Sequence, residues 1–363
     1  MKIIALLGLF VFVFTEILVA QVRPGFNPIE YKEMLEINSQ HFDTLLGEHT
    51  LPKPTASLIF RSKELGLDNR WDYWKTSDNI GVISIRGTIP TKVSWIENFY
   101  ASMIPAIGEI VTSDSVVFKY KLAKDNRASV HAGWLLGLSF IADDINALMH
   151  SEYDKGVRSF IFIGHSQGGA LSLLLRSYIE YVDDALGNKI QIKTYASAPP
   201  KPGNLYYAYD FEEINQGGWA FRIVNYDDWV PELPFAVQQV SDLNPTNPIS
   251  NINELIKNEP WYARYYIKRT IKKIENKGGD LQETYTELLG DKAFEGVIKE
   301  LPNAKKPIFD EGFNYSTCGN AIVLRPTDSY VKNYVEKSDY GIFVHHHFYA
   351  YWMLINAHFP EID

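Results

Sequence analysis

The stretch from Val157 to Ala170 reads V-R-S-F-I-F-I-G-H-S-Q-G-G-A, and it decides the fold. Its first part is a mostly apolar run of the length of a buried strand, and the small residues at its end lead into a helical pattern over 169–182. Between the two lies G-H-S-Q-G at 164–168, a G-x-S-x-G motif. Glycines on either side of the serine permit a tight strand-to-helix turn that exposes the hydroxyl. The motif therefore predicts Ser166 as a nucleophile.

Further strands and helices alternate on both sides of this turn. Apolar runs predict strands over 80–85, 190–196 and 221–225, and a 3.6-residue periodicity predicts a helix over 137–153. A second helical pattern covers 348–357. Strands that alternate with helices at this spacing indicate an α/β fold, in which a mostly parallel central sheet is covered by helices on both faces.

Composition limits the function classes. Of the 363 residues, 46% are hydrophobic and 22% are charged, which is typical of a folded globular protein. The net charge of −9 lacks the basic footprint of a nucleic-acid-binding protein. The single cysteine, Cys318, forms no intramolecular disulfide and no cysteine-based zinc site. We expect no cofactor, no nucleic-acid partner and no obligate protein partner.

The N-terminus has the pattern of an export signal. Lys2 precedes an apolar run over 3–14, and Leu18-Val19-Ala20 offers a cleavage point after residue 20. A membrane anchor is the alternative, but Glu16 interrupts the run before it reaches the roughly 20 residues that span a bilayer. We predict a signal peptide over 1–20 and a secreted or periplasmic protein.

A nucleophilic serine needs a base and an orienting carboxylate. In α/β-hydrolases these follow the serine in the order acid, then histidine, which leaves His345, His346, His347 and His358. His358 lies in a short tail, so the base is expected from the cluster His345-His346-His347. Neighbouring side chains in an extended segment point in opposite directions, so a metal site formed by all three is the poorer interpretation. The carboxylate is expected after the strand at 221–225, from Asp227 or Asp228.

Four blocks together resemble the class 3 (fungal-type) lipases, in the order found in that family. They are I-S-I-R-G-T at 83–88 with S-W-I-E-N at 94–98, H-A-G-W at 131–134, F-I-G-H-S-Q-G-G-A-L at 162–171, and F-R-I-V at 221–224 with D-W-V-P at 228–231 and L-P at 233–234. The resemblance covers roughly 78–234. It implies an α/β-hydrolase that cleaves carboxylic esters.

The resemblance also assigns roles to residues. It implies Asp228 as the catalytic acid and His346 as the base, with His347 as the alternative. It implies an oxyanion hole formed by Thr88, through its N–H and hydroxyl, and by the N–H of Gln167, which stands where the family commonly has leucine. The long interval between Asp228 and His346 indicates a helical insertion or cap at about 236–326 within one hydrolase domain over 21–363.

We expect a secreted lipase that acts on acylglycerols through a Ser-Asp-His triad. The alternatives are a soluble carboxylesterase, a phospholipase, a feruloyl-type esterase, or an inactive lipid- or glycan-binding protein of the same fold. The apolar segment 95–107 is either a lid that faces a lipid interface or an ordinary buried helix.

One stretch of the expected insertion is basic. Residues 257–277 hold seven basic and two acidic side chains, and we expect a helix that starts at Pro260 and ends at Gly278-Gly279. This helix presents either a solvated face or an interfacial surface for anionic lipid.

Overall fold

The structure is a computed structural model that describes residues 22–42, 49–114, 116–182, 186, 189–244, 246–249 and 252–360. The signal peptide expected over 1–20 lies outside the described residues.

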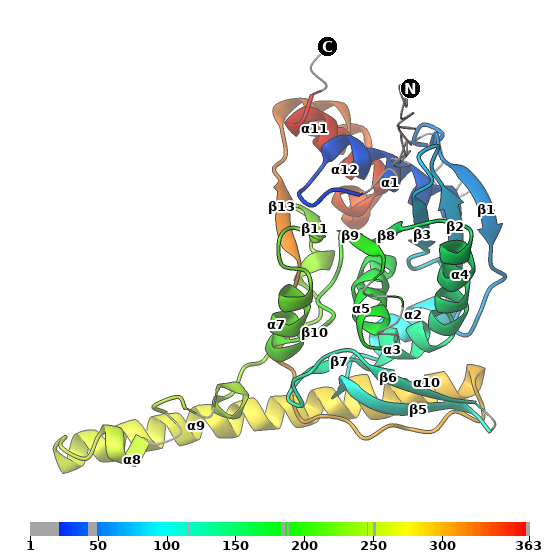
Figure 1. Ribbon diagram of the computed structural model, residues 1–363. Helices are drawn as coiled ribbons and strands as arrows, with labels where there is room; N and C mark the ends of the chain where they lie inside the picture. The colour runs from blue at the N-terminus through cyan, green and yellow to red at the C-terminus, as the bar shows by residue number, and fades with distance from the viewer. Residues whose placement is uncertain are drawn as a thin grey trace, which may run out of the picture.

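A seven-stranded sheet forms the centre of the molecule (Figure 1). Its strands, in spatial order, are β1 (Ser57–Arg61), β2 (Trp71–Lys75), β3 (Gly81–Ile85), β8 (Ser159–His165), β9 (Gln191–Ser197), β11 (Ala220–Asn225) and β13 (Asn320–Leu324). The strands from β3 to β13 in this order pair parallel with one another. At one edge of the sheet, β2 pairs antiparallel with both β1 and β3. The expected mostly parallel sheet is confirmed.

Helices cover both faces of this sheet. Helices α1 (Pro28–Ser39) and α12 (Phe348–His358) lie on one face, and α3 (Ala132–Ser139), α4 (Ala142–Asp154) and α5 (Gln167–Val182) lie on the other (Figure 1). Strand β8 shows the alternation directly. Its Phe160 and Phe162 are buried on the α5 side, and Ile161 and Ile163 are buried on the α1 side. Side chains on both faces of a central parallel strand must be apolar, which explains the continuous run in the sequence.

The helix expected over 137–153 is in fact two helices. His131 caps α3 through its side chain, which accepts a hydrogen bond from the N–H of Trp134, so helical structure begins earlier than expected. The chain then makes a tighter turn at Phe140 and Ile141, whose N–H groups bond carbonyls three residues back. The apolar periodicity continues through this break because both helices pack on the same core.

Smaller elements surround the sheet. A second sheet has the order β12 (Tyr315–Ser316), β10 (Gly203–Asn204), β7 (Ser129–His131) and β4 (Met103–Pro105), and β5 (Ile107–Ser113) pairs with β6 (Val116–Lys121) as a hairpin. The remaining helices of the body are α2 (Lys92–Phe99), α7 (Leu205–Ile214) and α11 (Asp328–Asn333).

The region expected as an insertion contains a long helical rod that projects from the body (Figure 1). It comprises α9 (Trp261–Tyr285), a π-helical turn over Thr286–Asp291, and α10 (Lys292–Glu300), and the short helix α8 (Ile252–Leu255) precedes it in the chain. The expected end at Gly278-Gly279 is wrong, because α9 continues through both glycines. Gly278 lies against the side chain of Gln239, and Gln282 one turn later is buried, so packing offsets the weak helix propensity of glycine.

The C-terminal end of the same region belongs to the hydrolase body. Residues 320–324 form β13, which pairs with β11 as the edge strand of the main sheet. The part of the chain that leaves the body therefore ends before this strand.

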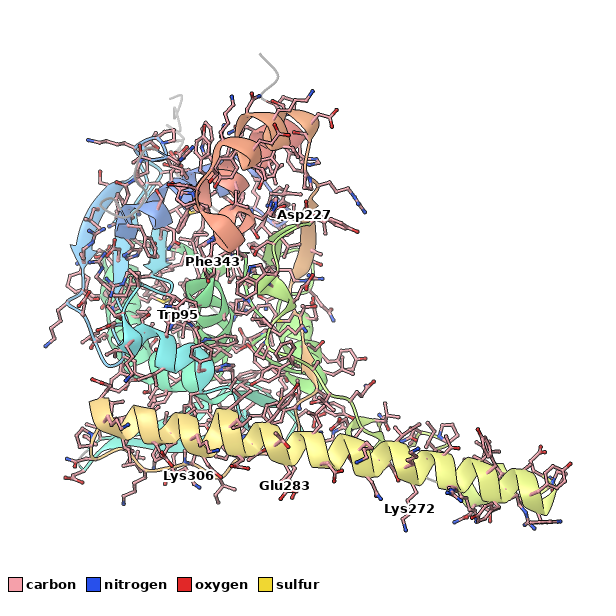
Figure 2. All side chains as sticks on the ribbon, turned by 180° about the vertical axis from the view of Figure 1, so that it is seen from behind. Trp95, Asp227, Lys272, Glu283, Lys306 and Phe343 are labelled. Carbon is pink, nitrogen blue, oxygen red and sulfur yellow. The ribbon has the colours of Figure 1, made fainter. Side chains whose placement is uncertain are left out.

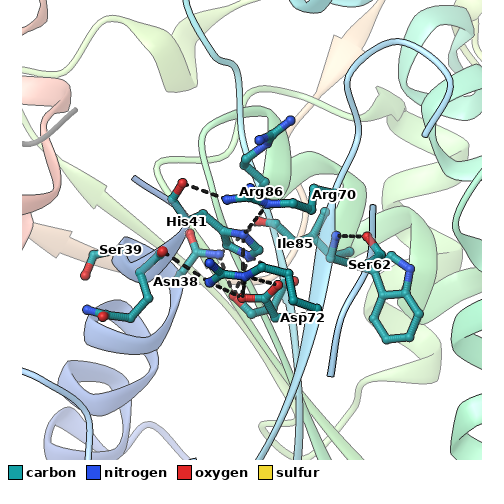
Figure 3. A network of polar contacts seen from close by, with 12 residues as sticks. Asn38, Ser39, His41, Ser62, Arg70, Asp72, Ile85 and Arg86 are labelled. Carbon is teal, nitrogen blue, oxygen red and sulfur yellow. Dashed lines mark hydrogen bonds and ion pairs between the residues drawn. The ribbon is translucent and has the colours of Figure 1, made fainter. Parts of the chain in front are cut away.

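A buried polar network joins the N-terminal segment to β2 and β3 (Figure 3). The Asp72 carboxylate accepts hydrogen bonds from Arg61 and lies 3.7 Å from His41. The Asn38 side chain donates to the Ser84 hydroxyl and to the carbonyl of Ile85, at 2.9 Å each. Burial, with Arg70 and other arginines nearby, lowers the pKa of His41 well below its ordinary value. The network therefore holds a neutral histidine and fixes the end of β3, where the R-G-T turn begins.

Candidate active site

Ser166 occupies the sharp turn between β8 and α5. Its backbone has φ +60°, a strained conformation for a residue with a Cβ. The turn is closed by the Ser166 N–H, which donates to the carbonyl of Ser197 at 2.9 Å. A Cβ at Gly164 would lie 2.0 Å from the Gly168 carbonyl oxygen, so the motif has no room for a larger residue there. The Ser166 side chain is half-buried at this turn, as expected for a nucleophile elbow.

Asp228, which is buried, and His346, which is half-buried, form a hydrogen-bonded pair. The distance from His346 Nδ1 to Asp228 Oδ2 is 2.7 Å. The same carboxylate accepts a hydrogen bond from the Tyr351 hydroxyl at 2.7 Å and one from the Val230 N–H at 3.0 Å. Burial alone raises the pKa of Asp228, but His346 and these hydrogen bonds outweigh it, and the net pKa lies below its ordinary value. An ionised Asp228 fixes the proton of His346 on Nδ1 and leaves Nε2 as an acceptor.

The neighbouring Asp227 is exposed and lies outside this pair. Its backbone N–H bonds the Asn225 side chain, which places it in the turn after β11.

The three adjacent histidines have three different environments. The His345 ring contacts the Tyr330 hydroxyl at 2.9 Å. The His347 side chain caps α12 by accepting from the Tyr349 N–H at 3.2 Å, and its ring stacks on Tyr340. Burial lowers the pKa of His347 to about 4, so this ring is neutral. Of the three, His346 is the one that reaches Asp228.

His165, directly before the serine, contacts the backbone of His346. Its Nε2 lies 2.7 Å from the His346 carbonyl oxygen, and its Nδ1 lies 3.0 Å from the Ser197 hydroxyl. Burial and the nearby His346 lower the pKa of His165 to about 3, so the ring is neutral. A carbonyl only accepts, and therefore His165 Nε2 carries the proton and its Nδ1 accepts from Ser197. Sequence reasoning missed this role, because no local pattern reveals a contact across 181 residues.

The R-G-T turn after β3 lies directly against the serine turn. A Cβ at Gly87 would lie 2.5 Å from the His165 carbonyl oxygen. The Thr88 hydroxyl donates to the side-chain oxygen of Gln167 at 2.8 Å and accepts from the Asn98 amide at 2.8 Å. The Thr88 hydroxyl was expected to donate to an oxyanion. In this arrangement its proton is instead donated to Gln167. Gln167 is the first residue of α5, so its N–H has no acceptor within the helix.

A second buried group, Glu97, lies behind these residues. The Asn69 amide donates to its carboxyl group at 2.7 Å, and its side chain fills the space where Gly137 has no Cβ. Burial raises the pKa of Glu97 to about 8, although Asn69 and Gln167 act in the opposite direction. The group is therefore mostly protonated at neutral pH. No residue pattern in the sequence indicates a role for Glu97.

Aromatic side chains lie in series beside His346. The Phe343 ring lies 6.3 Å from the His346 ring, 5.5 Å from Trp229 and 6.4 Å from Trp95, measured between centroids. Trp95 in turn stacks on the exposed Phe99. Figure 2 shows Trp95 and Phe343 on the same side of the molecule. We call these four side chains the aromatic rim.

The segment 95–107 was expected to be either a lid or an ordinary buried helix, and its residues differ in exposure. Phe99 is exposed and Trp95 is half-buried, but Tyr100, Met103 and Ile104 are buried. Only its first part, within α2, contributes to the aromatic rim.

Residues 82–238 match the family model of the class 3 lipases. This segment is therefore similar to the class 3 lipases. The expected resemblance is thereby confirmed over β3, the serine turn, β11 and the turn that carries Asp228. The arrangement of the sheet and its helices is the α/β-hydrolase fold.

Relatives with curated names match parts of the chain. The chain is 36% identical over 107 residues to secreted mono- and diacylglycerol lipase 3 of Gibberella zeae, covering 29% of this chain and 32% of the relative. It is 29% identical over 154 residues to secreted mono- and diacylglycerol lipase 1 of Fusarium solani, covering 42% and 39%. The matches therefore span less than half the length of these relatives.

Among solved structures, the lipase of Rhizopus microsporus var. chinensis matches 58% of this chain and 71% of its own, with 18% identity and a TM-score of 0.42. Within the described part of the present chain, no helix combines the length and the apolar character that a membrane crossing requires.

Proposed function

We propose that this protein is an exported lipase that hydrolyses acylglycerols through Ser166, His346 and Asp228. The observation that carries the proposal is the ionised Asp228 bonded to His346 Nδ1, beside a serine in the strained turn of a nucleophile elbow. The match of residues 82–238 to the family model of the class 3 lipases supports the same chemistry.

In the proposed reaction, Ser166 Oγ attacks the ester carbonyl carbon and His346 Nε2 takes the hydroxyl proton. Asp228 stabilises the imidazolium that forms. The proton then passes to the leaving alcohol, and water, deprotonated by the same histidine, releases the fatty acid. The N–H groups of Thr88 and Gln167 would stabilise the oxyanion, and the Thr88 hydroxyl would act by holding the Gln167 side chain.

The aromatic rim supports an apolar acyl group as the substrate. Phe343, Trp229 and Trp95 lie in series beside His346, and Ile342 next to them is 72% exposed. Two relatives carry names as mono- and diacylglycerol lipases, which supports glycerides over other esters. Their names also describe them as secreted, which agrees with the export signal expected over 1–20. N-terminal sequencing of protein from the culture medium should begin at Gln21, and an uncleaved Met1 would contradict export by cleavage.

The deciding experiment compares hydrolysis of p-nitrophenyl esters of increasing chain length with hydrolysis of emulsified mono-, di- and triacylglycerols. We expect a preference for long chains and faster turnover at an emulsion surface, and no activity in Ser166→Ala. Preference for short soluble esters would indicate a carboxylesterase, and activity that survives Ser166→Ala would remove the mechanism.

A further inference from the structure

We propose that helix α9 is a docking element for membranes or lipid surfaces that carry anionic head groups. The helix leaves the body of the protein as a rod, and Lys272 lies on the part that projects (Figure 2). Its first four turns carry aromatic and basic side chains on the exposed side. We call this surface the aromatic-basic face. Its members are Trp261, Tyr262, Tyr265, Tyr266, Lys268, Arg269, Lys272 and Lys273.

The aromatic half of this face is exposed to an unusual degree. Trp261 is 74% exposed and Tyr266 is 71% exposed, and Tyr262 and Tyr265 are each at least 60% exposed. Large aromatic groups at such exposure on a projecting helix have no core to stabilise. Tryptophan and tyrosine favour the head-group region of a bilayer, where the ring meets apolar carbon and the polar atom meets water.

The basic half lies on the same side of the helix. Successive members are three or four residues apart, as in Tyr262, Tyr266, Arg269 and Lys273, so they line up along one side of α9. The side chains of Ile267 and Ile271 occupy the opposite side and are partly buried. From 261 to 274 the sequence contains no acidic residue, within a chain of net charge −9. This local positive charge selects an anionic surface over a neutral one.

The rod is held firmly to the part of the protein that carries the candidate active site. The Phe294 ring of α10 lies 5.9 Å from the Tyr100 ring, and the Ser102 N–H donates to the Leu289 carbonyl at 3.2 Å. Helix α10 also packs against α2, which bears Trp95 and Asn98. Docking of α9 would therefore tether the body that carries the candidate active site to the lipid surface that supplies an ester.

The test measures binding to vesicles of phosphatidylcholine with and without phosphatidylglycerol, by co-sedimentation. All proteins carry Ser166→Ala, so that lipid hydrolysis plays no part and failure of the proposed lipase activity does not affect the result. The test variant is Lys268→Gln/Lys272→Gln/Lys273→Gln. The matched control is Lys53→Gln/Lys119→Gln/Lys332→Gln, which removes the same charge from exposed sites elsewhere.

We expect the parent to bind the anionic vesicles and not the neutral ones. Each cation at the surface contributes about fivefold, so the α9 variant should bind about 100-fold more weakly, whereas the control should lose less than about threefold. Trp261→Ser/Tyr266→Ser should also weaken binding. All lysine variants should unfold thermally at the same temperature as the parent, which shows that the fold is intact.

Three results would overturn the proposal. The first is equal binding by the α9 variant and its control, and the second is equal binding to neutral and anionic vesicles. The third is a concentration-dependent dimer in sedimentation velocity that the α9 variant abolishes without any change in vesicle binding, which would assign the face to a second copy of the chain.

Discussion

The Nε2 of His165 lies 2.7 Å from the main-chain carbonyl oxygen of His346. The residue before the candidate nucleophile thus holds the backbone of the candidate base. The hydrogen bonds continue from His165 Nδ1 to the Ser197 hydroxyl and from there to the Tyr31 hydroxyl at 2.8 Å. This chain of contacts ties the base to β9 and to α1.

Loss of the His165 contact should reduce turnover without preventing folding. Phenylalanine in His165→Phe retains the ring that packs 4.3 Å from Phe348 but removes the hydrogen bond to the His346 carbonyl. We expect kcat to fall by about 10- to 100-fold with little change in KM, because a small displacement of a catalytic group is costly. Steady-state kinetics with a p-nitrophenyl ester measure both constants. An unchanged kcat would show that His346 keeps its position without this contact.

Substitutions of the adjacent residues His346 and His347 should have very different effects on kcat. His346→Ala should reduce kcat by at least about 10⁴-fold, because the residue would be the general base. His347→Asn should leave kcat within about twofold, since asparagine also caps a helix and the Asp228 carboxylate bonds His346 and not His347. Thermal unfolding provides the control for stability. A larger loss in His347→Asn than in His346→Ala would reverse the assignment.

The two neighbouring aspartates offer a matched pair. Asp228→Asn should lower kcat by about 10⁴-fold, because the amide cannot stabilise the His346 imidazolium and disturbs its tautomer. Asp227→Asn has the same change in charge at an exposed position and should have almost no effect. Active-site titration with a fluorophosphonate probe compares the two variants directly. Equal labelling rates would exclude Asp228 as the acid of the triad.

The Thr88 hydroxyl should act through Gln167. If it only positions this side chain, Thr88→Val should lower kcat by about tenfold, and almost none of that loss should remain in a Gln167→Leu background. If the hydroxyl instead turns to donate to the oxyanion, Thr88→Val should lower kcat by about 10²- to 10³-fold in both backgrounds. A double-mutant cycle on kcat distinguishes the two outcomes.

Glu97 should make stability decrease as the pH rises. Its folded pKa of about 8 lies above the ordinary value of 4.5, so the folded state binds the proton more tightly than the unfolded state. The contribution is fully present below pH 4.5 and is lost between there and about pH 8, at about 1.4 kcal/mol per pH unit. Urea unfolding of Glu97→Gln and the parent should give stability curves that diverge over this range. Parallel curves would contradict a raised pKa.

Much of the fold was predictable because its signals are local. The run before Ser166 is apolar on both faces, and the glycines around the serine permit only a sharp turn, so the strand, turn and helix follow from neighbouring residues. The choice between Asp227 and Asp228 was not predictable from the residues alone, because both fit a turn and only burial separates them. The contact of His165 with His346 and the burial of Glu97 depend on packing between distant elements. The length of α9 was also not predictable from the sequence, since a glycine pair normally ends a helix.

The order of the elements along the chain has a consequence for synthesis. Ser166 and Asp228 lie in the body, but His346 is held where the chain enters α12, which packs against α1 and against β11 and β13. A growing polypeptide would therefore carry the candidate nucleophile and acid well before the candidate base is translated and docked. Ester hydrolysis inside the cell would be prevented until the last helix is in place.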